Sequence, residues 1–307
     1  MKKYIILILI IAVSIKSFSA SLSITKRLDN IETIVYGQKR LNESIESRIA
    51  RLETIVFGKN YSENNLGSRL TRLEKPFQFK DLDFTLPEKL DFLEWKLENS
   101  IKSIPCLAKT SHIKKLALGI GSLQDPLIFE VNKLIAVLLN GGELIKQNMK
   151  ITSEIEIKTL LKNRISSKYN HRGDKIEMEL LNSITKDNLI AFPAGSRIIG
   201  TLSSVRKAGL FGKNGRIKIK LDSIFGFGGK KYNLRLTQMA LSQDKQDKVV
   251  AGITLLGVAA LGPVGAVSGI FIRGKDIYIH PNTEFILTIE IPDIIKAFAK
   301  DSTLVKQ

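Results

Sequence analysis

The chain contains one cysteine, Cys106, and three histidines among its 307 residues. A single thiol cannot form an internal disulfide, so stability must come from burial rather than from cross-links. The histidines, His112, His171 and His280, are far apart in the sequence and share no metal-ligand spacing. Cys106 and His112 match no family signature of a nucleophile pair, and Cys106 is interpreted as a small buried apolar side chain.

Recognisable catalytic motifs are also missing. The segment GFGGK at 226–230 is interpreted as a hairpin turn, because the rest of a phosphate-binding loop is not present. The tripeptide RGD at 172–174 stands where a turn between strands is expected, which favours a structural turn over an adhesion motif. No Ser-His-Asp order and no paired carboxylates stand out. The sequence therefore predicts no enzyme, and it assigns no catalytic, cofactor-binding or metal-binding residue.

Acidic residues are few compared with basic ones. The chain has 47 Lys and Arg against 30 Asp and Glu, and nine of the basic residues lie between Arg206 and Arg235 with one acid, Asp222. Nucleic acid is the usual partner of such a stretch, but no aromatic-basic binding motif accompanies it. The expected partner is an anionic membrane surface or wall polymer, with no nucleic acid. A biased composition with solvated lysines is the open alternative.

The amino-terminal end is typical of a secretory signal peptide. Lys2 and Lys3 precede a short apolar run over about 4–13, and the small residues of SFSA follow at 17–20. An uncleaved anchor is the alternative, but the apolar run is short for a membrane span. We therefore predict an exported protein of the periplasm or cell envelope. Removal of 1–20 would lower the formal net charge from +17 to +14.

The following segment repeats itself at a spacing of 21 residues. RLDNIETIVYG starts at Arg27, RIARLETIVFG at Arg48, RLTRLEKPF at Arg69, and a weaker copy, KLDFLEWKL, at Lys89. Each unit is expected to be a short helix, which is marginal alone and must pack on its neighbours or on another copy of the chain. The units resemble a short motif, R-L-x-x-L-E-x-x-V-F-G, that occurs in exported bacterial proteins whose role is not established.

Apolar residues of the two full copies recur at helical spacing. They are Leu28, Ile31, Ile34, Val35, Ile49, Leu52, Ile55 and Val56. Gly37 and Gly58 stand where helices end in a left-handed cap. Pro76 is expected to end the third helix early, and Asp125 to cap a later helix whose first residue is Pro126. The stripe is expected to be buried, either by plain helical packing or by a partner.

From about Ile151 the apolar pattern changes from helical spacing to alternation. The alternating segments are SEIEIK, KIEMELL, SRIIGTLSSV, RIKIKLDSI, YNLRLT and TEFILTIEI. Pro193 and Gly195 provide the turn chemistry of one hairpin. In RIKIKLD, alternation places Arg216, Lys218 and Lys220 on one face. The pattern predicts a small antiparallel barrel or sandwich.

The same region resembles a β-domain of exported bacterial envelope proteins, with the patterns S-S-K-x-x-x-G-D, P-x-G-[ST]-x-x-x-G and F-G-x-x-G. The matching residues are Ser166, Ser167, Lys168, Gly173, Asp174, Pro193, Gly195, Ser196, Gly200, Phe211, Gly212 and Gly215. A later P-x-G turn is replaced here by His280, Pro281 and Asn282, and Asn tolerates the left-handed conformation that such a turn needs. The resemblance covers about 151–292 and implies fold and compartment. The order of the motifs is more distantly similar to the outer-membrane channel subunit of type IV secretion machines.

An uncharged run of 24 residues at 249–272 is long enough to cross a bilayer. Gly262 and Pro263 interrupt it, and the alternating segments on both sides belong to one expected domain. We therefore predict an apolar helical hairpin that returns to the side from which it started. It either completes the core or dips into a membrane.

Together these patterns predict an α+β fold, with N-terminal short helical repeats followed by a small antiparallel β-barrel or sandwich with an inserted apolar helical hairpin. The expected segments are a signal peptide at 1–20, short helical repeats at 21–100, a helical connector at 101–150, a β-domain at 151–292 with the hairpin at 249–272, and a C-terminal tail at 293–307. The expected function is that of a non-catalytic structural or interaction protein of the cell envelope. A subunit of a secretion or conjugation channel is the alternative, and the repeats could also form a homo-oligomer.

Overall fold

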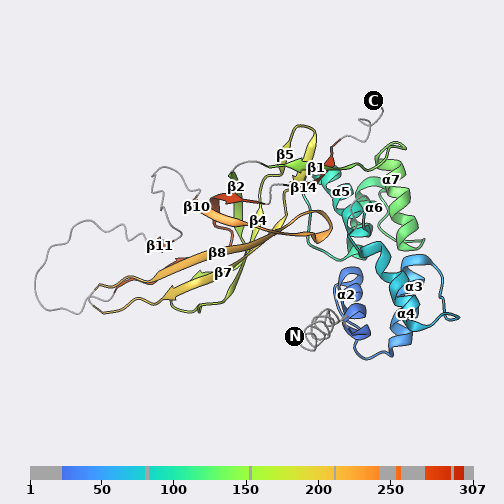
Figure 1. Ribbon diagram of the computed structural model, residues 1–307, viewed down its shortest axis with the longest axis horizontal. Helices are drawn as coiled ribbons and strands as arrows, with labels where there is room; N and C mark the ends of the chain where they lie inside the picture. The colour runs from blue at the N-terminus through green and yellow to red at the C-terminus, as the bar shows by residue number, and fades with distance from the viewer. Residues whose placement is uncertain are drawn as a thin grey trace, which may run out of the picture.

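The computed structural model describes residues 23–79, 83–151, 154–210, 212–241, 254–256, 274–291 and 294–300. Helices occupy the first part of these residues and antiparallel sheets the second, so the α+β prediction is confirmed. In Figure 1 the helices gather at one end, and the hairpin of β7 (Arg197–Arg206) and β8 (Arg216–Phe225) reaches away at the other. The predicted signal peptide and most of the predicted apolar hairpin lie outside the described residues.

Six helices follow one another in the described amino-terminal half. They are α2 (Ile24–Tyr36), α3 (Ile45–Phe57), α4 (Leu66–Glu74), α5 (Leu86–Glu98), α6 (Cys106–Leu118) and α7 (Leu127–Leu138). Their N-cap residues are Ser23, Ser44, Asn65, Thr85, Pro105 and Pro126. Successive N-caps are 20 or 21 residues apart, so the repeat continues through all six helices. The predicted connector at 101–150 therefore contains two further repeat units.

The ends of the first helices follow from their sequence. The side chain of Ser44 accepts a hydrogen bond from the backbone N–H three residues later, which satisfies a free donor of the first turn. Gly37 and Gly58 end α2 and α3 in the left-handed conformation, with φ of 81° and 78°. Pro76 lies in a single 3₁₀ turn, η1 (Lys75–Phe77), where α4 stops. The predicted left-handed caps at Gly37 and Gly58 and the predicted early end of the third helix at Pro76 are confirmed.

The start of α7 differs from the prediction. Pro126 is the N-cap residue rather than the first helical residue, and the side chain of Asp125 makes no capping bond. Instead, the carboxylate of Glu130 accepts hydrogen bonds from the backbone N–H groups of Gln124 and Asp125. The side chain of Glu130, inside the helix, thus satisfies two backbone N–H donors that precede the helix.

The helices form two groups of three, each with its own apolar core. The core of α2–α4 consists of Leu28, Ile31, Val35, Ile49, Leu52, Val56, Leu70 and Leu73. The core of α5–α7 consists of Leu86, Leu90, Leu93, Cys106, Ile113, Leu127, Val131 and Leu134. Among the predicted stripe residues, Ile34 is exposed and Ile55 is only partly buried. Leu107 and Ile128 contact both cores, so the two groups pack against each other.

The β-strands form antiparallel sheets. The largest has the order β10-β13-β2-β4-β7-β8-β11, with β9 also paired to β8. Its further strands are β2 (Ile155–Leu161), β4 (Lys175–Leu180), β9 (Lys231–Asn233), β10 (Arg235–Leu241), β11 (Thr254–Leu256) and β13 (Glu284–Glu290). Because β10 also lies close to β8, this sheet curls into a nearly closed barrel. All six predicted alternating segments contribute strands, and YNLRLT is divided between β9 and β10.

Two smaller sheets complete the described β-region. A four-stranded sheet has the order β1-β14-β6-β5, and a two-stranded sheet pairs β12 with β3. Their strands are β1 (Lys146–Lys150), β3 (Ile165–Ser166), β5 (Ile184–Lys186), β6 (Leu189–Phe192), β12 (Tyr278–Ile279) and β14 (Ile294–Ala299). The predicted turns at Gly195 and Asn282 are left-handed, with φ of 84° and 64°. Glycine is required at 195, since a Cβ atom there would collide with the carbonyl oxygen of Ile101.

Two boundaries of the predicted β-domain need correction. Residues 294–299 are not part of a tail, because they form β14, which pairs with both β1 and β6. Ala297 and Phe298 of this strand are buried, and that burial of apolar surface explains why the segment docks. β1 likewise belongs to the sheet rather than to the connector.

The predicted apolar hairpin is described only at Thr254–Leu256. These three residues are extended rather than helical, and they form β11, which pairs with β8. The reason is that the outer edge of β8 offers backbone donors and acceptors that another strand can satisfy. No helix among the described residues combines the length and the apolar character needed to cross a bilayer.

An aromatic cluster joins the helices to the β-region. The ring of Phe298 in β14 lies 5.8 Å from that of Phe92 in α5 and 4.3 Å from that of Phe227, centroid to centroid. All three side chains are buried. Next to them, the backbone N–H of Gly228 donates to the carboxylate of Asp91 at 2.7 Å. The two halves therefore share a packed and hydrogen-bonded interface.

Candidate functional site

Charged side chains connect neighbouring helices at equivalent positions of the repeat. The residues four and nine places after each N-cap are here called positions +4 and +9. Glu32 at +9 of α2 bonds to Arg48 at +4 of α3, with Oε2 and Nη2 2.6 Å apart. Glu53 at +9 of α3 bonds to Arg69 at +4 of α4, at 2.8 Å. All four side chains are buried, so each pair sits inside the bundle rather than on its surface.

A third pair closes the first helix group into a ring. Glu74, at +9 of α4, accepts two hydrogen bonds of 2.7 Å from Arg27, at +4 of α2. The bidentate geometry is the strong form of an Arg–carboxylate interaction. Each helix of the group thus contributes the arginine of one ion pair and the glutamate of another.

The second group uses the same positions and reverses one pair. Glu94 at +9 of α5 bonds to Lys109 at +4 of α6, at 2.7 Å. In the next pair Lys114 holds +9 and Glu130 holds +4, again at 2.7 Å. Burial tends to lower the pKa of Lys109, but Asp91 and Glu94 outweigh it and raise that pKa above its usual value. Lys109 is therefore charged at neutral pH.

The same carboxylates also hold the loops between helices. Their Oε2 atoms accept a backbone hydrogen bond from the residue eight places further on, at 3.0 Å for Glu32, 3.1 Å for Glu53 and 2.9 Å for Glu94. One carboxylate thus fixes both the following loop and the following helix. This double role explains the Glu of the repeat motif, and it is a structural role rather than a catalytic one.

The residues considered for catalysis are used by the fold. Cys106 is buried, and burial raises the pKa of its thiol to about 12, so it is not a thiolate at neutral pH. His112 lies on the same helix, but its Nε2 is 3.1 Å from Oε2 of Glu98 in α5 and 3.0 Å from Nζ of Lys102. Only one group within the described residues, Glu94, Glu98 and His112, brings three potential metal ligands together. His171 and His280 do not belong to this group.

The two loop motifs also have structural roles. In RGD, the carboxylate of Asp174 accepts hydrogen bonds from the backbone of His171 and the side chain of Asn170, and these bonds lower its pKa. In GFGGK, the backbone N–H of Gly228 is bound by Asp91 rather than left free for a phosphate. Both observations agree with the interpretation of these segments as turns.

A surface of a different kind lies on the β7–β8 hairpin, which we call the basic hairpin face. It consists of the exposed residues Arg206, Lys207, Lys213, Arg216, Lys218 and Lys220. The three on β8 alternate with buried apolar residues, as predicted. In Figure 1 the hairpin reaches away from the helices, so the helices do not cover it.

The charges of the basic hairpin face are not neutralised within the described chain. Arg206 lies directly opposite Arg216 in the pairing of β7 with β8, and like charges in such positions repel each other. The nearby acid, Asp222, belongs to β8, and its carboxylate bonds to Thr201 of β7 and to Lys175 of β4, the latter at 2.9 Å. None of the six basic side chains forms an ion pair with an acid of the described residues. An arrangement of this kind is suited to an anionic partner.

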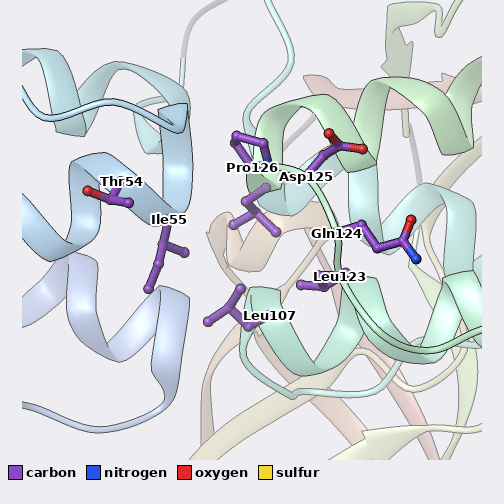
Figure 2. Close-up of a pocket in the computed structure, with 8 residues that line it drawn as sticks. Thr54, Ile55, Leu107, Leu123, Gln124, Asp125 and Pro126 are labelled. Carbon is purple, nitrogen blue, oxygen red and sulfur yellow. The ribbon is translucent and has the colours of Figure 1, made fainter.

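A cleft of about 350 Å³ lies between the two helix groups. Figure 2 shows Ile55 on one side of it, with Leu107 and Pro126 on the other. The carboxylate of Asp125 is bonded to Lys133 and the hydroxyl of Thr54 to a backbone carbonyl. Because these polar groups already have partners, the cleft offers no convergent set of groups for a small ligand.

Comparison of the chain with protein-family models and with curated proteins finds no match.

Proposed function

We propose that this chain is a non-catalytic, exported interaction protein of the cell envelope, and that its basic hairpin face docks on an anionic membrane surface. The observation that carries the proposal is the set of six exposed basic residues on one hairpin without an acidic partner in the described chain. Each Lys or Arg near an anionic bilayer contributes roughly 1 kcal/mol to binding.

Two apolar features favour a membrane over a soluble anionic polymer. Leu210, in the loop between β7 and β8, is 55% exposed and lies within the sequence of the basic residues. In addition, β11 belongs to the uncharged run at 249–272 and pairs with β8 opposite Arg216 and Lys218. The basic side chains can contact the anionic headgroups of a bilayer while the neighbouring apolar segments reach the acyl boundary.

The helical half supplies a stiff body for this contact. Its ring of ion pairs and its two cores fix six short helices, and the aromatic cluster joins them to the β-region. A rigid carrier reduces the conformational entropy that is lost when the hairpin binds.

Vesicle sedimentation tests the proposal. Protein that lacks residues 1–20 should bind vesicles of phosphatidylglycerol and not vesicles of phosphatidylcholine, and added salt should weaken the binding. A triple variant, R206Q/R216Q/K218Q, should lose on the order of a hundredfold in affinity, which corresponds to the contribution of three basic residues. The matched control removes three exposed lysines elsewhere, K96Q/K115Q/K150Q, and should bind nearly as well as the parent chain.

Three outcomes would contradict the proposal. They are equal binding to the two kinds of vesicle, equal losses in the two triple variants, and tighter binding to soluble poly(glycerol phosphate) than to the anionic vesicles. The last result would assign the basic hairpin face to a wall polymer instead.

A further inference from the structure

Three metal-ligating side chains converge between α5 and α6. Glu94 and Glu98 are one turn apart on α5 and therefore lie on the same face of that helix. His112 faces them from α6, with its Nε2 3.1 Å from Oε2 of Glu98. One ligand atom from each side chain lies within 4.8 Å of the other two.

The buried carboxylate of Glu94 has an oxygen without a partner. Its Oε2 accepts hydrogen bonds from Lys109 and from the backbone of Lys102, but its Oε1 is buried and makes no hydrogen bond. The Glu94 side chain is 0% exposed. A buried acceptor left without a donor or cation is destabilising, and a cation bound by the Glu94 carboxylate would reduce that cost.

The ammonium group of Lys102 lies where a metal ion would bind. Nζ of Lys102 lies 2.8 Å from Oε2 of Glu98 and 3.0 Å from Nε2 of His112. The same Nε2 lies near a donor, Lys102, and an acceptor, Glu98, and its role depends on the tautomer of His112. In the tautomer with the proton on Nδ1, Nε2 accepts from Lys102, and the same lone pair can bind a metal. The Lys102 side chain is 48% exposed, and its flexible stem can turn towards solvent.

We infer that Glu94, Glu98 and His112 form a site for a divalent transition metal, with Zn²⁺ as the fitting ion, and that Lys102 is the cation it displaces. One imidazole nitrogen and two carboxylate oxygens are a usual zinc ligand set. Ligand atoms around tetrahedral Zn²⁺ lie about 3.4 Å apart, so binding would draw the three atoms, which lie within 4.8 Å of one another, closer together. The bound ion would clamp α5 to α6. This site lies in the helical half and does not depend on the proposed role of the hairpin.

Zinc titration of the full chain after treatment with EDTA tests the inference. Isothermal calorimetry should show one strong site, and the melting temperature should rise with ZnCl₂. H112A should weaken zinc binding at least a hundredfold while the protein still folds, since the side chain of His112 is partly exposed. K102M should bind zinc at least tenfold more tightly, because it removes the competing ammonium.

Two control variants separate this site from surface binding. H171A and H280A alter the other two histidines and should leave the zinc affinity unchanged. Substitution with Co²⁺ should give visible absorption bands that H112A abolishes. The inference is wrong if H112A binds zinc as tightly as the parent chain, if H171A or H280A removes the site, or if K102M leaves the affinity unaltered.

Discussion

In the helical half, many charged side chains lie between the elements, whereas in the β-half most of them lie on the outside. The exception is Lys146 of β1, whose side chain is 2% exposed and bonds to Glu88 of α5 at 2.9 Å. Ten buried charged residues of the described chain belong to the helical repeats. They are Glu32, Arg48, Glu53, Arg69, Glu88, Asp91, Glu94, Lys109, Lys114 and Glu130. The buried polar residues of the described β-region are Thr159 and four serines, none of them charged.

The difference follows from what each half needs in order to adopt a single arrangement. Short helices with similar apolar stripes could pair in several orders, and a buried Glu finds its cation only in the correct neighbour. The reversed pair of Lys114 and Glu130 makes the last contact distinct from the others. In the β-half, alternation and turns already set the register. Its charges can therefore remain outside, where they can bind a partner.

The largest expected effect comes from removing one partner of a buried pair. R69M leaves the carboxylate of Glu53, which is fully buried, without its cation. We expect the free energy of unfolding to fall by about 3–5 kcal/mol, because an unpaired buried charge is costly. Urea unfolding followed by circular dichroism measures this loss.

The matched control is an exposed pair of the β-half. Lys162 bonds to Glu179 at 2.8 Å, with both side chains partly in solvent. K162M should cost less than about 1 kcal/mol, as is typical of surface ion pairs. Similar losses in R69M and K162M would contradict the distinction between the two halves.

Much of the fold could be predicted from the sequence, but the full extent of the repeat could not. Alternation predicted the main strands, and helical spacing predicted α2 and α3. In α6 and α7, proline takes the cap position that Ser44 and Asn65 hold in earlier units. The reversal of Lys114 and Glu130 further hides the Arg and Glu positions of the motif. Only the packing of the helices shows that these units are equivalent.

The candidate sites depend on contacts that spacing alone does not give. Alternation predicted the basic face of β8, but the opposition of Arg206 and Arg216 requires the register of β7 with β8, which is shifted at two places. Glu94 and Glu98 have the spacing of a helical ligand pair. His112 joins them only because α5 and α6 pack side by side, so the sequence prediction of no metal ligands could not take it into account.

A second, intermediate effect concerns the contact between the two helix groups. Gly58 ends α3 with φ of 78°, and a Cβ atom there would collide with Cγ of Pro126 at the start of α7. Gly119 ends α6 in a similar conformation, with φ of 75°, but no atom lies within 4 Å of its would-be Cβ. Both alanine variants carry the strain of a left-handed residue, about 1–2 kcal/mol. Only G58A adds overpacking.

We therefore expect G58A to destabilise the protein more than G119A does, by an additional 1–3 kcal/mol or so. Thermal and urea unfolding of the two variants give the difference directly. If the two variants lose the same amount, then Gly58 does not pack against Pro126 and the contact between the helix groups lies elsewhere.

The smallest expected change in stability concerns Arg206, and it tests whether the exposed charges of the hairpin stabilise the fold. Arg206 faces Arg216 directly, so R206T removes a repulsion and places a residue suited to strands in β7. We expect the free energy of unfolding to rise by about 0.2–1 kcal/mol. The comparison variant is R235T, which removes the partner of Glu290, 2.7 Å away on β13. It should lower stability by a similar amount, because it breaks an attraction of like size.

The two variants are expected to change the free energy of unfolding in opposite directions. This difference distinguishes an arginine that stabilises the fold from one that serves another purpose. If R206T is stabilising and R235T is destabilising, then the arginine of the hairpin reduces the stability of the fold. Its role must then be sought in a partner such as the anionic surface proposed above. If R206T instead destabilises the protein as much as R235T does, then Arg206 contributes to the stability of the hairpin. The basic hairpin face would then need no partner to explain it.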